Sequence, residues 1–393
     1  MIIYNKEWLN NLHIIEHLQN DFEDGSVTKE ELNAIKASHP VGFYQPGIVM
    51  RVGLFIITVI VLTLSAALLS LMASGMQIAD SPGWLLFLGA LCYFITETFI
   101  RGHNHYHSGI DNAALYFAAG LLSSGGVWIL SDAHLTIGEE LLPCVFVCLL
   151  CLYLTLRFSD LLVCAAACIA AFASVYFFWG MFGKFGLATM PFIMMVASGG
   201  TYVVFSKLII EKKHLYYANC IATVKLLSLI TLYSSGNYFV VNTLNNMLNG
   251  LSDSHTYVPV GFIFWAWTML VPIVYVYFGL RKKNVMLLRL GMLLIAATVA
   301  TVRVYYHLLP IEVMLTLSGA IILAATYVII SYLKMPRNGI IYAEPERANL
   351  ADKLNIEGLI IGESTSHIPA GPQAPSSPFG GGTGGGGGSS SSF

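Results

Sequence analysis

The chain carries little charge. Asp, Glu, Lys and Arg make up 11% of its 393 residues, and hydrophobic residues make up 56%. Because a soluble domain has about 25% charged residues, this composition excludes an ordinary soluble protein. Basic residues are not in excess either, since 20 Lys and Arg stand against 22 Asp and Glu, for a net charge of −2. The sequence therefore offers no basic surface to attract nucleic acid, and we exclude nucleic acid as a partner.

Several motifs and signals are also missing. There is no Walker loop, HExxH, GxSxG or dinucleotide-binding fingerprint, so we expect no recognisable enzymatic activity and no cofactor. The seven cysteines are odd in number and all lie within apolar runs, which argues against a disulfide framework. The first 46 residues are polar with a helical pattern, unlike a secretory signal peptide. We expect the first membrane helix to direct insertion itself.

Long apolar runs dominate what is present. From Gly47 onward we count ten that approach the roughly 20 residues needed to cross a bilayer. They span Ile48–Met72, Pro82–Ile100, Ile110–Leu130, Leu141–Leu156, Leu161–Gly180, Phe185–Ile209, Tyr216–Tyr233, Val258–Leu280, Val285–Val302 and Val313–Leu333. The fourth run is the shortest. The predicted fold is an all-α polytopic bundle of about ten membrane helices over residues 47–333.

The charges of the connecting loops predict the orientation. With a cytoplasmic N-terminus, the outer connections hold only Lys184 and Arg303. The inner loops hold Arg101, Arg157, Lys207, Lys212, Lys213, Arg281, Lys282 and Lys283. This bias is what the positive-inside rule requires for ten helices with both chain ends in the cytoplasm.

Two polar segments flank the membrane domain. Residues 1–46 predict a headpiece of two short helices, in which Thr28 and Glu31 have the spacing of a capping box. Residues 334–393 predict a largely disordered cytoplasmic tail, because the Pro, Gly and Ser of this segment bury too little apolar surface to offset chain entropy. Either segment is a candidate for binding protein partners.

One charge lies inside an apolar run. Lys225 falls near the middle of Tyr216–Tyr233, where an ammonium costs roughly 2.5–3.5 kcal/mol to insert. On a helical wheel Ser228, Thr231 and Ser235 share a sector of about 120° with it, which predicts a polar stripe. This stripe predicts a solute or ion site. The alternative is a structural lysine held by carbonyls or a carboxylate.

Glu97 is the candidate counter-ion for Lys225. We place it about 5 Å from the cytoplasmic end of its helix, against about 13 Å for Lys225, a difference that two long side chains can bridge. Arg101 lies four residues after Glu97, however, which equally favours an ion pair within one helix.

Histidines and cysteines form two further groups. His103, His105 and His107 alternate in a short turn, so a zinc, nickel or copper site is one hypothesis and a polar interfacial turn the other. The cysteines Cys144, Cys148, Cys151, Cys164 and Cys168 fall on single faces of two successive helices. We interpret them as small hydrophobic packing residues.

Three segments together carry a resemblance. The headpiece stretch DGSVTKEEL, the junction RGHNHYHSGIDNAALYF and the Phe-Gly-Gly-Gly-rich terminus resemble a group of uncharacterised bacterial multi-pass membrane proteins. The resemblance implies the same architecture and a bacterial inner-membrane location, and it transfers no catalytic residue.

These observations leave three hypotheses. The first is a non-enzymatic membrane protein that handles a small solute or ion through a polar interior near Lys225, with the lipid bilayer as its surroundings. The second is a membrane scaffold or sensor whose headpiece and tail bind partners. The third is a metal-dependent membrane enzyme that uses the histidine turn.

Overall fold

The computed structural model contains twelve helices and only an isolated β-bridge in the part of the chain that it describes. That part comprises residues 2–23, 26–75, 78–133, 139–208, 216–249 and 260–305, with single positions between 313 and 327. The all-α prediction is confirmed. The helices are α1 (Lys6–Glu23), α2 (Lys29–Ser38), α3 (Ile48–Ser74), α4 (Pro82–His103), α5 (Ile110–Asp132), α6 (Leu141–Phe158), α7 (Leu161–Gly180), α8 (Gly183–Leu208), α9 (Ala218–Gly236), α10 (Tyr238–Asn249), α11 (Gly261–Arg281) and α12 (Val285–Tyr305).

Nine of these helices are long and apolar enough to cross a membrane, counted over the described residues. They are α3 to α9, α11 and α12, so the first nine predicted runs each correspond to one helix. The short fourth run is confirmed as α6. The tenth run, Val313–Leu333, and the tail from residue 334 lie outside the described residues apart from a few single positions. The amphipathic helix α10 was not predicted.

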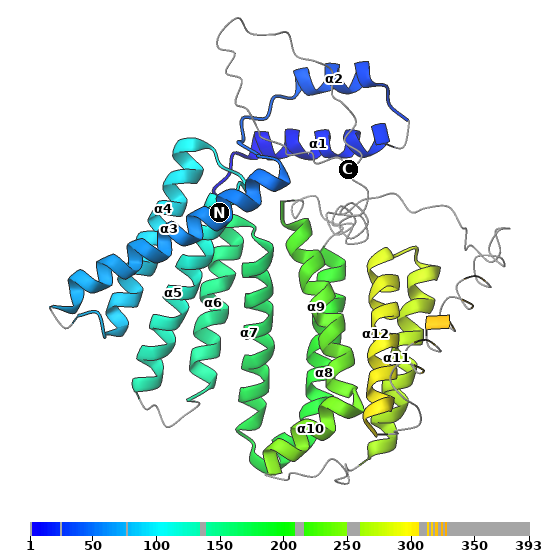
Figure 1. Cartoon of the computed structure of the whole chain (residues 1–393). Coiled ribbons are helices and arrows are strands. Elements are labelled where there is room, and N and C mark those ends of the chain that lie inside the picture. The colour runs from blue at the N-terminus through cyan, green and yellow to red at the C-terminus, as the bar shows by residue number, and fades with distance from the viewer. Residues whose placement is uncertain are drawn as a thin grey trace, which may run out of the picture. The chain divides into compact units, whose positions relative to one another are not determined.

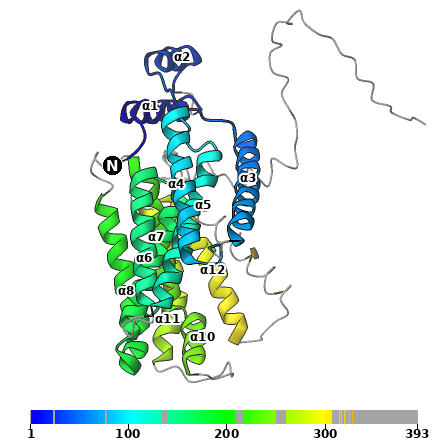
Figure 2. The same ribbon diagram turned by 90° about the vertical axis from the view of Figure 1, so that its left-hand side faces the viewer.

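Consecutive helices pack as antiparallel pairs. The most extensive contacts join α4 to α5, α6 to α7, α8 to α9 and α11 to α12, and the helices α5 to α9 run side by side in Figure 1. Glycine allows one of the closest approaches: a Cβ at Gly236 of α9 would come within 2.3 Å of Trp267 on α11. By contrast α3 packs mainly on α5 and is otherwise exposed, at the edge of the bundle (Figure 2).

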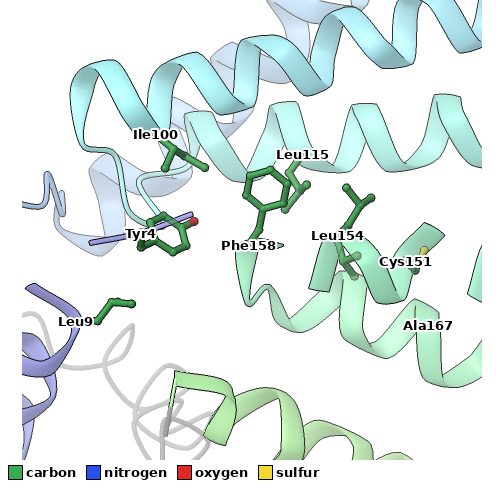
Figure 3. Packing of buried hydrophobic residues seen from close by; sticks show 9 residues of the cluster. Tyr4, Leu9, Ile100, Leu115, Cys151, Leu154, Phe158 and Ala167 are labelled. Carbon is green, nitrogen blue, oxygen red and sulfur yellow. The ribbon is translucent and has the colours of Figure 1, made fainter. Parts of the chain in front are cut away.

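The headpiece contains the capping box predicted from its sequence. In α2 the Glu31 backbone N–H donates to Thr28 Oγ1 over 3.3 Å, and the Thr28 N–H donates to Glu31 Oε2 over 2.9 Å, so the capping box is confirmed. The segment before α1 packs against the helix bundle. The Ile3 N–H donates to the Arg157 carbonyl oxygen at 3.0 Å, and Tyr4 packs in a core with Ile100 and Phe158 (Figure 3).

The histidine turn is the second attachment of the headpiece. Tyr44 forms an isolated parallel bridge with His105, and its N–H donates to the Asn104 carbonyl oxygen at 3.0 Å. The Phe43 ring stacks on Tyr106 with centroids 4.9 Å apart. After the turn, Gly109 has φ +100°, and a Cβ there would lie 2.3 Å from a backbone oxygen of α3. Only glycine fits this backbone conformation without strain.

Candidate functional site

Lys225 lies on α9, seven residues from the start of the helix and so about 10 Å along it. The residue is half-buried. Within the described part of the chain it forms no hydrogen bond and no ion pair. The protein therefore contributes no counter-ion to this ammonium from the residues that the structure describes.

Glu97, the candidate partner, is occupied elsewhere. Its carboxylate forms an ion pair with Arg101 at 2.9 Å, which confirms the alternative within one helix, and a second ion pair with Arg157 of α6. The pairing of Glu97 with Lys225 is not found. The reason is the arrangement of helices, because α4 packs on α5 whereas α9 packs on α7, α8, α10 and α11.

The predicted polar stripe consists mostly of satisfied hydroxyls. Ser228 is fully buried and donates to the Val224 carbonyl oxygen at 2.7 Å, and Ser235 donates to the Leu232 carbonyl oxygen at 3.1 Å. Thr231 is half-buried. Because the Ser228 and Ser235 hydroxyls already donate their protons to carbonyl oxygens of α9, neither has a proton left to donate to a ligand.

A buried hydroxyl on α8 lies at the level of Lys225. A Cβ on Gly199 would contact Leu232, and a Cβ on Gly236 would contact Met195, which sets the antiparallel register of α8 and α9. Seven residues after Gly199 on α8 is Ser206, and seven residues before Leu232 on the antiparallel α9 is Lys225. Seven residues are about two turns, so these two residues lie on the same facing sides and at the same level. The Ser206 Oγ is buried and has no hydrogen-bond partner among the described residues.

A large apolar cavity adjoins this position. Its volume is about 610 Å³, it is open on one side, and its walls come from α6, α7, α8 and α9. At the start of α9 its wall is formed by Tyr217, Cys220, Ile221 and Val224, and neither Lys225 nor Ser206 is part of the described lining. The polar or sulfur-bearing members of the lining are Cys148, Thr155, Cys164, Cys168, Thr201, Tyr217 and Cys220. No Asp or Glu occurs among the described residues of the lining.

The cysteines behave as packing residues. All seven are free thiols, and Cys164, Cys168 and Cys220 form one apolar cluster with Phe172 and Val224. Among the described residues no three His, Cys, Asp or Glu side chains come close enough together to hold a metal ion.

The lack of a metal-binding group among the described residues also concerns the histidine turn. His103 is exposed, and the His105 ring nitrogen Nδ1 lies 2.7 Å from the Ser108 hydroxyl. Burial lowers the pKa of His105, which favours the neutral ring. His107 contributes its backbone N–H to Asp111 at 2.8 Å. The turn holds the headpiece, and the metal-enzyme hypothesis finds no support in its geometry.

Two buried carboxylates near this turn were not predicted from the sequence. Asp111 accepts hydrogen bonds from the backbone and hydroxyl of Ser108, and Asp160 caps α7 and accepts a bond from Tyr116 at 3.0 Å. Burial, together with both carboxylates, raises the pKa of Tyr4 well above its usual value, so the hydroxyl stays protonated. Both acids precede or begin helices, a position that commonly marks a cap.

A polar network inside the membrane domain was not predicted either. Asn237, between α9 and α10, donates to the Tyr233 hydroxyl at 2.9 Å and to Thr301 Oγ1 at 3.2 Å. The Tyr233 and Thr298 hydroxyls are 3.0 Å apart, and Thr298 also donates to the Thr268 carbonyl oxygen at 3.0 Å. All five residues are buried. The network joins α9, α11 and α12 through uncharged groups.

These features define a class of protein. Nine membrane-length apolar helices in the described residues, with ionised groups largely confined to their ends, make this an integral, multi-pass membrane protein. The chain matches no protein-family model, no curated protein and no solved structure. Its function therefore has to be argued from the site itself.

Proposed function

We propose that this membrane protein binds and handles a small anionic solute at Lys225, without catalysing a covalent reaction. One observation carries the proposal: a half-buried ammonium on a membrane helix has no counter-ion among the described residues. Intramembrane charges normally face a cavity or a partner and mark the path of a solute or ion. An anion from outside the chain would supply the missing partner.

Ser206 supports the same location. The buried Ser206 hydroxyl has no partner among the described residues, and the α8–α9 register brings it level with Lys225. A second hydrogen-bond donor beside an ammonium suits an anion and gives no advantage to a metal cation. We place this activity in a bacterial inner membrane, with the headpiece cytoplasmic, on the basis of the family resemblance and the charge bias of the loops.

The scaffold or sensor function remains the second candidate. It is favoured by α2, which packs mainly on α1 and leaves most of its residues exposed. A partner protein would have this surface available. In that case Lys225 would be a structural residue that binds no solute.

The two candidates are separated by a flux measurement on the purified protein in proteoliposomes, with chloride, acetate and inorganic phosphate as probes. We expect Lys225→Met to abolish flux of the preferred anion while insertion and thermal stability are kept, and Lys225→Arg to retain part of it. Lys207→Met, which removes an exposed lysine of α8, is the matched control. Loss of stability in Lys225→Met with no flux in the wild type would support the scaffold instead.

A further inference from the structure

Two thiols meet between α7 and α9, which pack side by side (Figure 1). The Cys164 thiol donates to the Cys220 carbonyl oxygen over 3.6 Å. The Cys220 thiol donates to the Asp160 carbonyl oxygen over 3.8 Å, and the same oxygen accepts the Cys164 backbone N–H at 3.1 Å. The side chains of Cys164 and Cys220 also interact directly with each other. The packing therefore brings together two free, buried cysteines from different helices.

A pair from two helices can close into a disulfide where neighbours on one helix cannot. The bond needs Cβ atoms about 3.8 Å apart. Residues four apart on a helix, such as Cys164 and Cys168, have Cβ atoms about 5–6 Å apart, which is too far. For Cys164 and Cys220 the separation is set by helix packing instead. In the apolar cluster that holds all three cysteines, Cys164 and Cys220 are thus the pair to consider.

Both thiols also border an open cavity. Cys164 and Cys220 are only 5% and 4% exposed, yet both line the cavity between α6, α7, α8 and α9. Its volume of about 610 Å³ and its open side allow a molecule from outside the bundle to reach them. Because most of the other lining side chains are apolar, an apolar reagent enters at a lower cost in free energy than a charged one.

The start of α9 favours a thiolate at Cys220. This cysteine is the third residue of α9, and the helix has no side-chain cap in the described part of the chain. Backbone N–H groups at an uncapped N-terminus and the positive end of the helix dipole stabilise a thiolate. At the start of α7, by contrast, the Asp160 carboxylate already accepts the Leu162 and Val163 N–H groups. Cys220 is therefore the thiol that we expect to react first.

We infer that Cys164 and Cys220 are a redox-active pair, which an organic hydroperoxide in the cavity oxidises to a disulfide between α7 and α9. The inference goes beyond the proposed function and does not depend on it. An organic hydroperoxide combines an apolar body, which suits the cavity, with an O–O bond that accepts two electrons.

The reaction has two steps. The Cys220 thiolate attacks the O–O bond, so that an S–O bond forms, and the alkoxide that leaves takes up the proton given up by Cys220. The products are a sulfenic acid and an alcohol. The Cys164 thiol then attacks the Cys220 sulfur, which forms the S–S bond and releases water. In total the two sulfurs lose two electrons and the hydroperoxide gains them.

Thiol mapping of the full-length protein in nanodiscs tests the inference. The reduced protein is treated with cumene hydroperoxide, the remaining thiols are blocked with N-ethylmaleimide, and tryptic peptides are analysed by mass spectrometry without reductant. Cys164 lies in the tryptic peptide 158–184 and Cys220 in the peptide 214–225. We expect these two peptides to be linked, and dithiothreitol to release them.

Variants assign the link. Cys164→Ser and Cys220→Ser should each abolish it, and Cys168→Ser should keep it, because peptide 158–184 contains both Cys164 and Cys168. Cys92→Ser removes a similarly buried thiol of α4 outside the cluster, so it is the matched control and should also keep the link. In Cys164→Ser, dimedone should trap a sulfenic acid at Cys220, because the thiol that would condense with it is gone. The corresponding alanine variant replaces any serine variant that does not purify as a monodisperse protein.

Several results would overturn the inference. One is the absence of linked peptides in the oxidised wild type, and another is a link from Cys168 in place of Cys164. Conversion of Cys220 to sulfinic or sulfonic acid without a link would have the same meaning. Faster linkage by hydrogen peroxide than by cumene hydroperoxide at equal concentration would overturn the assignment of an organic hydroperoxide as the oxidant.

Discussion

Replacing Asn237 with alanine tests whether the buried polar network holds α9, α10 and α12 together. The Asn237 side chain is 3% exposed. It accepts hydrogen bonds from the Phe239 N–H at 2.9 Å and the Val240 N–H at 3.3 Å, which makes it the N-cap of α10. The same side chain donates to Tyr233 and Thr301. Asn237→Ala removes all four interactions at once.

The expected loss follows from these contacts. An N-cap contributes about 1 kcal/mol, and a side-chain hydrogen bond between membrane helices about 0.6 kcal/mol. With one cap and two such bonds, Asn237→Ala should destabilise the protein by about 2 kcal/mol, roughly a thirtyfold shift in the ratio of folded to unfolded protein. Asn237→Ser should lose only about half as much, because serine keeps the cap.

The measurement is reversible unfolding of the purified protein in mixed micelles, with increasing SDS, followed by circular dichroism. Ser235→Ala is the control, since among the described residues the Ser235 hydroxyl bonds only to the Leu232 carbonyl oxygen of its own helix. We expect less than about 0.5 kcal/mol for this control, as for most substitutions without a buried partner. Equal stability of Asn237→Ala and Ser235→Ala would refute the role assigned to the network.

Two further predictions concern the headpiece side of the bundle. Glu97→Gln removes the carboxylate partner of Arg157, whose side chain is 20% exposed, and should cost about 1.5–3 kcal/mol in the same unfolding assay. Arg101→Met, at a side chain 63% exposed, should cost less than about 1 kcal/mol, and the reverse order would contradict the ranking of the two ion pairs by burial. Burial lowers the pKa of His105 in the folded protein, so docking of the headpiece should be strongest above the ordinary pKa of about 6.5 and should weaken as pH falls through the lowered value. Hydrogen exchange of the headpiece between pH 7.5 and 5 measures this, and a rate of opening independent of pH would contradict it.

The membrane helices could be predicted because hydropathy is a property of local sequence. A run such as Leu141–Leu156 must form all its backbone hydrogen bonds internally when it lies in lipid, so its apolar composition is enough to predict a helix. The Thr28 capping box is local in the same way. Both predictions are confirmed, since each depends only on residues a few positions apart.

Partners of charged residues could not be predicted in this way. Sequence gives the depth of Glu97 and Lys225 along their helices, but it does not tell which helices are neighbours. The contact between α4 and α6 supplies Arg157 to Glu97, and the guanidinium is well suited to a carboxylate. Depth therefore narrows the choice of partner without deciding it.

The uncharged network was missed because hydropathy gives Thr and Tyr little weight and because Asn237 lies beyond the end of the seventh apolar run. A usable signal was present after the seventh apolar run. Asn242, Asn245, Asn246 and Asn249 follow a helical repeat, which indicates an amphipathic helix after a break at Gly236-Asn237. The break itself is where the Asn237 side chain caps α10.

The two polar regions differ in whether their side chains already have hydrogen-bond partners, and for this reason we propose the solute at Lys225 and not in the network. In the network the Asn237 and Thr298 side chains already bond to the protein. A ligand there would replace existing hydrogen bonds and gain little free energy. At the α8–α9 interface Lys225 and Ser206 have no such bonds among the described residues. An anion at Lys225 and Ser206 would add hydrogen bonds without breaking any. A ligand would therefore gain more binding free energy there than in the Asn237 network.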